Sequence, residues 1–365
     1  MDSNVQDVRQ VEVIVANLKR RFSGVTSTVI ALLPAQSRRI RIAALGPNLP
    51  RDWPRITWSG LIRHGWQPPP GRPFRIWHAR RNLEMLVGLI LRSVLRMPLK
   101  LVFTSAAQRR RGAWSRFLRA RVDAVIAASP EAASYLAVPS VVVLHGVDTA
   151  RYRPAEDRDA QWAATGLPGK YGVGVFGRVR AQKGTDRFIH IMCRLLPRYP
   201  DFTAVIVGGI TPNQKEFADA LRAEISACGL GDRILFLGEL PADEVPAWLR
   251  RVTLVVGPQV SEGFGLVPLE AMASGTAVVA TRVGAARHLI VDGETGILVE
   301  PDDPAGLEAR IESLMRNPAA AATMGRRGRA HVEQRFSIER EAVGIQEVYE
   351  RLWGAAPGGR ERAGH

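Results

Sequence analysis

Two carboxylates flank a glycine-containing turn in the stretch SEGFGLVPLEAMASGTAVVA, residues 261–280. Glu262 and Glu270 have seven residues between them, Gly263 and Gly265 lie in the turn, and an apolar helical pattern follows. Glycine lets backbone N–H groups approach a ligand, and a helix N-terminus carries partial positive charge, so this turn favours a phosphate. Carboxylates would repel that phosphate unless they accept hydrogen bonds from hydroxyl groups of the same ligand. The pattern therefore indicates a ligand that combines phosphates with diols, as a nucleotide sugar does.

A matching positive group lies in FGRVRAQKGTD, residues 176–186. Arg178 follows an apolar run, and Lys183 and Gly184 come after a short loop and precede a helical pattern. Two cations in a strand-to-helix loop suit a diphosphate and could neutralise a leaving nucleoside diphosphate without a metal ion. Ordinary solvated loop cations are the alternative interpretation.

Strand-like apolar runs alternate with helix-length segments along the whole chain. The runs cover residues 11–17, 40–46, 74–77, 99–105, 123–129, 140–146, 171–177, 202–209, 233–238, 253–258, 276–281 and 296–300. This is the pattern of parallel sheets covered by helices. Ligands of such sheets bind beyond the carboxyl ends of the strands, which is where both chemical loops are expected.

A polar, proline-containing segment at residues 145–169 separates two series of these runs. We therefore expect an α/β protein with two doubly wound, Rossmann-like domains. The first would span residues 1–155, and the second, at residues 156–336, contains both chemical loops and would bind the nucleotide sugar. Residues 337–353 have the apolar spacing of an amphipathic helix, which we expect to pack back towards the N-terminal domain, and residues 354–365 form a tail.

Composition indicates a globular protein whose charge is unevenly divided. Of its 365 residues, 46% are hydrophobic and 23% are charged, and the formal net charge is +15. Residues 1–150 carry 23 Lys and Arg against 8 Asp and Glu, whereas the remainder carries 27 of each sign. The positive excess of the first part would attract nucleic acid, an acidic lipid headgroup or an anionic membrane surface. A solvated basic face is the simpler alternative.

Cysteine use and hydropathy favour a cytoplasmic protein. Cys193 and Cys228 have neither the spacing of a metal site nor the number expected of a disulfide framework. No signal peptide is visible at the N-terminus. The most apolar stretch, residues 83–103, is interrupted by Arg92 and Arg96, so no membrane span is expected.

Two segments resemble a known family. They are GRVRAQKG at residues 177–184 and SEGFGLVPLEAMASGTAVVATRVGAARHLIVDGETGILVEPDD at residues 261–303. Both are similar to the family 4 retaining glycosyltransferases, and the likeness covers most of residues 170–350. It implies the GT-B fold, in which two Rossmann-like domains face a central cleft, and it implies that the first domain binds the acceptor and the second the nucleotide sugar.

The resemblance also implies a role for each chemical residue. The glutamate that holds the donor sugar in that family corresponds to Glu262, and the glutamate that holds the nucleotide ribose corresponds to Glu270. The diphosphate would be bound by Arg178 and Lys183, which with Glu262 form the expected catalytic set. Backbone N–H groups that contact the donor would belong to Gly263, Phe264, Gly265 and Leu266. RILFLGEL, residues 233–240, resembles the segment that cradles the base, which implies that Leu237 and Leu240 lie near it.

Three N-terminal segments show the resemblance with departures. Gly24 in FSGVTSTVI resembles the glycine loop before the first helix, which implies a phosphate contact, although an ordinary turn would also use a glycine. RIWHARRN has His78 and Arg80 where the family often has His-x-His, which leaves the role of either side chain open. HGVDTARYRP resembles the family's interdomain linker, with His145 in place of asparagine, and a hinge role is expected.

Basic stretches of the first part narrow the resemblance. KRRFSGVTST, RIWHARRN and TSAAQRRRGAW, at residues 19–28, 75–82 and 104–114, most resemble bacterial lipopolysaccharide core mannosyltransferases. This implies transfer of mannose from GDP-mannose to an anionic, lipid-linked saccharide of the Kdo-lipid A type. It further implies a metal-independent enzyme, with no cofactor besides the nucleotide sugar and no nucleic-acid partner, lying peripherally at the inner face of the cytoplasmic membrane.

Three alternatives stay open. The same fold could use another donor, such as a UDP-sugar, or another acceptor. A sugar-nucleotide hydrolase or epimerase would keep the fold and change the chemistry. A basic nucleic-acid-binding protein would explain the arginine-rich half but not the two glutamates.

Three weaker patterns favour structural roles. Gly172, Gly174 and Gly177 satisfy G-x-G-x-x-G, but the first two lie inside an apolar run, so no dinucleotide site is expected. The acidic triplet at residues 157–159 could hold a metal ion but is better explained as a solvated turn. Four tryptophans are expected to pack in the core, or else to stack on sugars or lie at a headgroup interface. They are Trp53, Trp58, Trp66 and Trp77.

Overall fold

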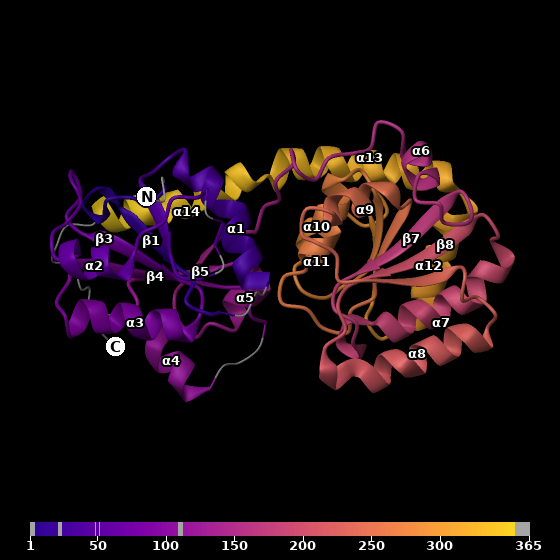
Figure 1. Cartoon of the computed structure of the whole chain (residues 1–365), viewed down its shortest axis with the longest axis horizontal. Coiled ribbons are helices and arrows are strands. Elements are labelled where there is room, and N and C mark those ends of the chain that lie inside the picture. The colour runs from indigo at the N-terminus through magenta and orange to yellow at the C-terminus, as the bar shows by residue number, and fades with distance from the viewer. Residues whose placement is uncertain (1–3, 21–23, 48, 51, 109–111, 355–365) are drawn as a thin grey trace. The chain divides into compact units, whose positions relative to one another are not determined.

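The computed structural model describes residues 4–20, 24–47, 49–50, 52–108 and 112–354. The chain divides into two compact units, shown in Figure 1: a first unit of Met1–Gly146 with Ile338–His365, and a second unit of Val147–Ser337. Within the described residues each unit contains one six-stranded sheet. All neighbouring strands in both sheets are parallel, and every strand coincides with one of the apolar runs, so the predicted doubly wound α/β architecture is confirmed.

The sheet of the first unit has the order β2-β1-β3-β4-β5-β6. Its strands are β1 (Val13–Ala16), β2 (Ile42–Leu45), β3 (Arg75–Ala79), β4 (Leu99–Ser105), β5 (Ala124–Ala127) and β6 (Val141–Val142). Val13 pairs with Ile42 of β2 on one side and with Ile76 of β3 on the other. The winding direction therefore reverses between β1 and β3, which is where a sheet of this kind opens a crevice at its carboxyl edge.

Helices cover both faces of this sheet because the strands alternate apolar side chains between the faces. Val13 and Val15 face α1 and α14, whereas Ile14 and Ala16 face the opposite helices. The helices are α1 (Gly24–Ser37), α2 (Trp58–His64), α3 (Asn82–Ser93), α4 (Ala113–Arg119), α5 (Pro130–Ser134) and α14 (Ile338–Gly354), with a 3₁₀ turn η1 at Val8–Gln10. Figure 1 shows α14, the last helix of the chain, beside α1 of the same unit.

The sheet of the second unit has the order β12-β11-β10-β7-β8-β9. Its strands are β7 (Tyr171–Phe176), β8 (Phe202–Val207), β9 (Ile234–Gly238), β10 (Leu254–Gly257), β11 (Ala277–Thr281) and β12 (Ile297–Val299). Counted from β7, this is the order 3-2-1-4-5-6 of dinucleotide-binding sheets. The reversal falls between β7 and β10, whose carboxyl ends lie side by side.

One face of the second sheet packs against α7, α8 and α12 around a core that includes Phe188, Met192 and Ile311. Figure 1 shows α7 and α8 on one side of the sheet and α9 and α10 on the other. The helices of this unit are α6 (Arg158–Ala163), α7 (Thr185–Leu195), α8 (Lys215–Ala227), α9 (Val245–Arg251), α10 (Leu266–Ala273), α11 (Ala286–Leu289), α12 (Pro304–Arg316) and α13 (Pro318–Arg335), with 3₁₀ turns η2 (Ala181–Lys183), η3 (Leu196–Arg198) and η4 (Pro212–Gln214). Among the described helices, none is both long and apolar enough to span a membrane.

The change of unit falls at Gly146 and Val147 rather than at residue 155, because side chains of the second unit hold the intervening segment. The guanidinium of Arg329 in α13 donates hydrogen bonds to the carbonyl oxygens of Thr149 and Tyr152, at 3.0 and 2.6 Å. On the other side of the change, the carboxylate of Glu341 in α14 contacts His145 Nδ1 at 2.7 Å and accepts a hydrogen bond from the Gly146 N–H at 2.8 Å. His145 therefore anchors the start of α14 within the first unit.

Candidate active site

The two chemical loops of the sequence lie at the strand reversal of the second unit. The loop after β7 carries Arg178 and Lys183, and the loop after β10 carries Glu262. Since β7 and β10 are adjacent and parallel, both loops leave the same edge of the sheet. Ligands of open parallel sheets bind at this edge and at this reversal.

The loops meet through an ion pair between Lys183 and Glu262. The Nζ of Lys183 contacts Oε2 of Glu262, and the two side chains are 21% and 20% exposed. The other carboxylate oxygen accepts a hydrogen bond of 2.8 Å from the N–H of Gly263. The lysine that is expected to bind the diphosphate is thus in direct contact with the glutamate that is expected to hold the sugar. The ammonium group can bind phosphate while it holds the carboxylate in place.

The contact between Lys183 and Glu262 depends on a close approach of the two loop backbones. Gly184 ends the turn η2 with φ +70°, and a Cβ on it would lie 2.1 Å from the carbonyl oxygen of Pro258 in the loop after β10. Only glycine accepts both the left-handed backbone and the missing space. The sequence places this glycine directly after Lys183, so the approach also fixes the position of the lysine.

Gly184→Ala is expected to destabilise the second unit by about 2–4 kcal/mol, because it combines a strained backbone with a steric clash. Turnover should fall as well, because Lys183 must move with the displaced loop. The matched control is Gly166→Ala, at φ +71° with open space around the Cβ position, which should cost only about 1–2 kcal/mol and leave turnover unchanged. Urea unfolding and steady-state kinetics of both variants measure the difference, and equal losses would show that the approach to Pro258 is unimportant.

The start of α10 offers backbone N–H groups. Its N-cap is Gly265, at φ +88°, which provides no side-chain hydrogen bond to the first turn. The preceding Phe264 is buried and its carbonyl oxygen accepts a hydrogen bond of 2.8 Å from the Ala285 N–H. N–H groups of the first turn without a cap and the helix dipole favour an anion at this point. The Gly263 N–H already donates to Glu262, and contact of the N–H groups of Gly263 to Leu266 with the donor stays a prediction.

Glu270 lies one turn into α10 and is held by Tyr152. The phenolic O–H donates a hydrogen bond of 3.1 Å to Oε1 of Glu270. Burial raises the pKa of Glu270, while this hydrogen bond and the charge of Arg151 oppose the rise. Burial beside the carboxylate also raises the pKa of Tyr152, so the phenol remains a donor. Sequence analysis missed Tyr152, because nothing in the segment from 145 to 154 links it to a residue more than a hundred positions later.

A third cation accompanies the predicted pair. Arg178 is exposed, whereas the neighbouring Arg180 is half-buried. Burial and the charge of Arg178 lower the pKa of Arg180, and Glu262 opposes that shift. In the described part of the chain the Nε of Arg180 has no hydrogen-bond partner. The loop after β7 therefore carries three cations, of which Lys183 contacts Glu262 and Arg180 lies near enough to be affected by its charge. The sequence signal for Arg180 was its place between Arg178 and Lys183.

The remaining predicted contacts lie elsewhere in the two units. Leu237 belongs to β9, at the edge of the second sheet beyond β8, and Leu240 follows that strand; both are half-buried. Gly24 begins α1 of the first unit, and a Cβ on it would meet nothing within 4 Å. No steric reason requires glycine at that position, and the phosphate contact stays a prediction.

The weaker patterns have structural explanations. A Cβ on Gly172 would lie 2.3 Å from the ring of Trp162, so this glycine admits a buried tryptophan rather than a dinucleotide. Asp157 caps α6, because its carboxylate accepts a hydrogen bond of 2.9 Å from the Ala160 N–H. Among the described residues, no group of three or more His, Cys, Asp or Glu is arranged to hold a metal ion. Of the four tryptophans, Trp77 is fully buried, whereas 42% of Trp58 and 44% of Trp66 are exposed.

Comparison with known proteins defines the class. The family model for glycosyl transferases group 1 matches residues 157–331. The structure of Anabaena HepE in complex with UDP and glucose covers 94% of this chain and 100% of its own, with a TM-score of 0.79 and 20% sequence identity, and shows the same GT-B fold. Together with two relatives that are 52% and 48% identical over 95% of the chain, the family match shows that the chain belongs to the group 1 glycosyltransferases and is an enzyme of that family.

Two relatives extend over nearly the whole chain. Lipopolysaccharide core biosynthesis mannosyltransferase LpcC of Rhizobium leguminosarum bv. viciae is 52% identical, over 95% of this chain and 98% of its own length. The mannosyltransferase LpsB of Rhizobium meliloti, named for the same biosynthesis, is 48% identical over 95% and 99%. In the second unit, the crystal structure of the C-terminal domain of LpcC from Francisella tularensis is 40% identical and covers 53% of this chain, with a TM-score of 0.51.

Proposed function

We propose that this chain is a retaining mannosyltransferase that moves mannose from GDP-mannose to a lipid-linked lipopolysaccharide core acceptor of the Kdo-lipid A type. The observation that carries the proposal is the meeting of Lys183 and Glu262 at the strand reversal of the second unit. Two full-length relatives that are named as lipopolysaccharide core mannosyltransferases support the choice of sugar and of acceptor.

The chemistry follows from the charges of the site. The C1–O bond to the diphosphate breaks while C1 bonds to the acceptor oxygen on the same face, and a diphosphate oxygen takes the acceptor proton. The leaving group gains negative charge in this step, and Arg178, Arg180 and Lys183 together with the N-terminus of α10 stabilise it. These residues supply the charge stabilisation that a divalent ion supplies in other transferases, so the proposed reaction needs no metal.

The acceptor side of the proposal rests on the first unit. Its α2, α3 and α4 expose large apolar side chains, and Arg121 stacks on Phe117 with its guanidinium carbon 3.5 Å from the ring centroid. The exposed residues are Trp58, Ile62, Trp66, Leu83, Ile90, Trp114 and Phe117. Apolar residues among arginines suit a peripheral position on an anionic bilayer, where each basic residue contributes about 1 kcal/mol. We propose the cytoplasmic face of the inner membrane as that surface.

Donor preference tests the proposal against its alternatives. Calorimetry should show that GDP-mannose binds more tightly than UDP-glucose, and at about 100 times its dissociation constant it should stabilise the protein by roughly 2.7 kcal/mol. Tighter binding of a UDP-sugar would show that GDP-mannose is not the donor, and the protein would still be a glycosyltransferase. Turnover of the nucleotide sugar without an acceptor would favour a hydrolase, and polynucleotides should not compete for the donor.

A further inference from the structure

A basic cavity lies at the carboxyl edge of the first sheet, apart from the donor site. Its volume is about 350 Å³. The wall is formed where β3, β4 and α4 meet beside the start of α1, which is the strand reversal of this unit. The polar side chains that line it are those of Arg80, Arg81, Asn82, Ser105, Ser115 and Arg119, and none of the described lining residues is acidic.

Two of the arginines differ in how their charge is balanced. Arg81 donates hydrogen bonds of 2.8 Å to both Glu84 Oε1 and Asn17 Oδ1, and one of 3.0 Å to Thr26 Oγ1. Its partner Glu84 is fully buried. Arg81 is therefore a structural cation that ties the loop after β1 to α3.

Arg80 has no such carboxylate. Only 8% of the residue is exposed, and within the described residues its guanidinium donates one hydrogen bond, of 2.8 Å, to Thr28 Oγ1. Its Nε is buried without a partner. The nearby carboxylate of Glu84 pairs with Arg81, and that of Glu341 contacts His145 Nδ1 and accepts a hydrogen bond from the Gly146 N–H.

Burial of the Arg80 guanidinium without an ion pair costs free energy unless a ligand binds to it. A buried cation without a charge partner loses its hydration and receives little in return. Burial lowers the pKa of Arg80, although nearby carboxylates oppose the shift, and an arginine stays protonated at neutral pH. An anion in the cavity would supply the missing partner, and the guanidinium can bind a carboxylate or a phosphate through two parallel hydrogen bonds.

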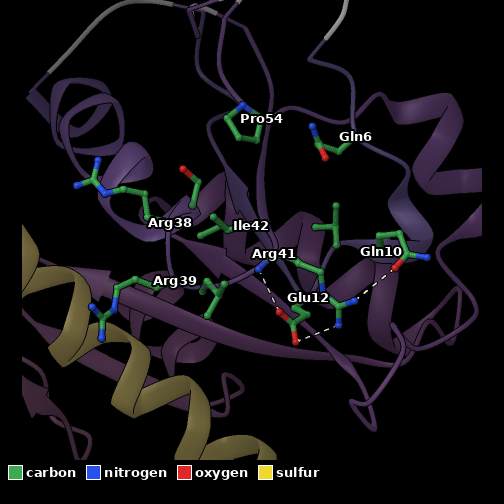
Figure 2. A pocket seen from close by; sticks show the side chains of 11 residues that line it. Gln6, Gln10, Glu12, Arg38, Arg39, Arg41, Ile42 and Pro54 are labelled. Carbon is green, nitrogen blue, oxygen red and sulfur yellow. Dashed lines mark hydrogen bonds and ion pairs between the residues drawn. The ribbon is translucent and has the colours of Figure 1, made fainter.

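The opposite edge of the same sheet provides a comparison. A cavity of about 430 Å³ lies at the amino ends of β1 and β2, and Figure 2 shows Arg41 in contact with Glu12 and Gln10 there. Glu12 accepts a hydrogen bond of 3.1 Å from the Arg41 N–H and pairs with its guanidinium at 3.4 Å, and that guanidinium also donates to Gln10. Arg38, which also lines this cavity, pairs with Glu339 at 3.2 Å. Both cavities contain basic residues, and they differ in Arg80, which is buried and forms no ion pair within the described residues.

We propose that the carboxyl-edge cavity binds the acidic group of the acceptor saccharide and that Arg80 is the residue that selects for it. The assignment to the acceptor rests on the proposed transferase function. The binding of a sugar-borne anion rests on the cavity alone. A carboxylate of an acidic sugar and a phosphate ester share this chemistry, and the test separates them.

The binding test uses three small sugars on the whole chain. Saturation-transfer NMR should detect glucuronate or glucose 6-phosphate with the unmodified protein and should detect glucose at least about tenfold more weakly, the loss expected for a hydrogen bond to a charged group. Whichever anion binds more tightly identifies the acidic group. Arg80→Gln should weaken that anion about tenfold, Arg80→Lys should restore part of the affinity, and Arg38→Gln should change nothing. Equal binding of the anion by Arg80→Gln and the unmodified protein would overturn the proposal.

Steady-state kinetics test whether the cavity binds the acceptor. Arg80→Gln should raise KM for the lipid acceptor about tenfold or more while leaving the dissociation constant of GDP-mannose unchanged. An acceptor whose acidic group is methyl-esterified should be equally poor for both proteins. If the unmodified chain transfers no sugar at all, the proposed function is wrong. The NMR titration then still shows whether the cavity binds a sugar-borne anion through Arg80. An unchanged acceptor KM in an active Arg80→Gln enzyme would overturn the role of Arg80.

Discussion

Lys183→Ala should lower kcat by a factor of roughly 30 to 5,000 while the protein stays folded. The side chain of Lys183 is 21% exposed; Lys183 is half-buried, as is Arg180, whereas Arg178 is exposed. Truncating one partner of a buried charge pair costs about 2–5 kcal/mol, and each 1.36 kcal/mol in the transition state is a factor of about ten in rate. The loss should appear mainly in kcat because the charge of the leaving group develops during the reaction.

Two further variants show whether the effect of Lys183→Ala is specific to the diphosphate site. Arg178→Ala should also slow turnover, by less, because Arg178 is exposed and solvent screens its charge. The control is Lys170→Ala, which removes the same charge from the same unit at the residue before β7, where the side chain is 72% exposed. Near wild-type rates in Lys183→Ala and Arg178→Ala together would contradict the diphosphate clamp.

Glu270→Gln and Glu262→Gln should separate the two ends of the donor. Glu270→Gln should weaken both GDP and GDP-mannose, because the ribose is common to them. Glu262→Gln should weaken GDP-mannose and spare GDP. Each loss should be about 1.5–3 kcal/mol, the range for hydrogen bonds to a charged group. Calorimetry with both ligands measures the four affinities.

The structure adds two controls to that experiment. Tyr152→Phe removes the hydrogen bond to Glu270 and should reproduce part of the Glu270→Gln effect on both ligands. Glu294→Gln changes an exposed glutamate of the same unit and should change neither affinity. If Glu262→Gln weakens GDP as much as GDP-mannose, the carboxylates do not divide the donor between them.

Much of the fold was predictable because its signals are local. Each strand of the described chain corresponds to an apolar run, and the two cations and two carboxylates follow strands β7 and β10. Parallel strands send their loops to one edge, so the sequence predicted that both loops lie at that edge, and the pairing of β7 with β10 in the structure brings Lys183 and Glu262 together. The similarity to group 1 glycosyltransferases is carried by the same segments.

The contacts that could not be predicted join residues far apart in the sequence. Tyr152 contacts Glu270 across 118 positions, and the contact between Gly184 and the Pro258 carbonyl joins loops that no local pattern connects. Arg80 could be noted as a departure from a family motif, but its lack of an ion pair is visible only when Glu84 and Glu341 are seen with other partners, Arg81 and His145. Burial and pairing decide the role of a charged side chain, and neither is a property of its immediate sequence.

The most direct test of the central claim is a transfer assay with radiolabelled GDP-mannose and a purified lipid-linked core acceptor. We expect the label to move into the lipid fraction only when protein and acceptor are both present. We also expect NMR of the product to show the α configuration of the donor retained, and EDTA to leave the rate unchanged. Release of free mannose without acceptor, an inverted product, or transfer that needs an added divalent ion would contradict the claim.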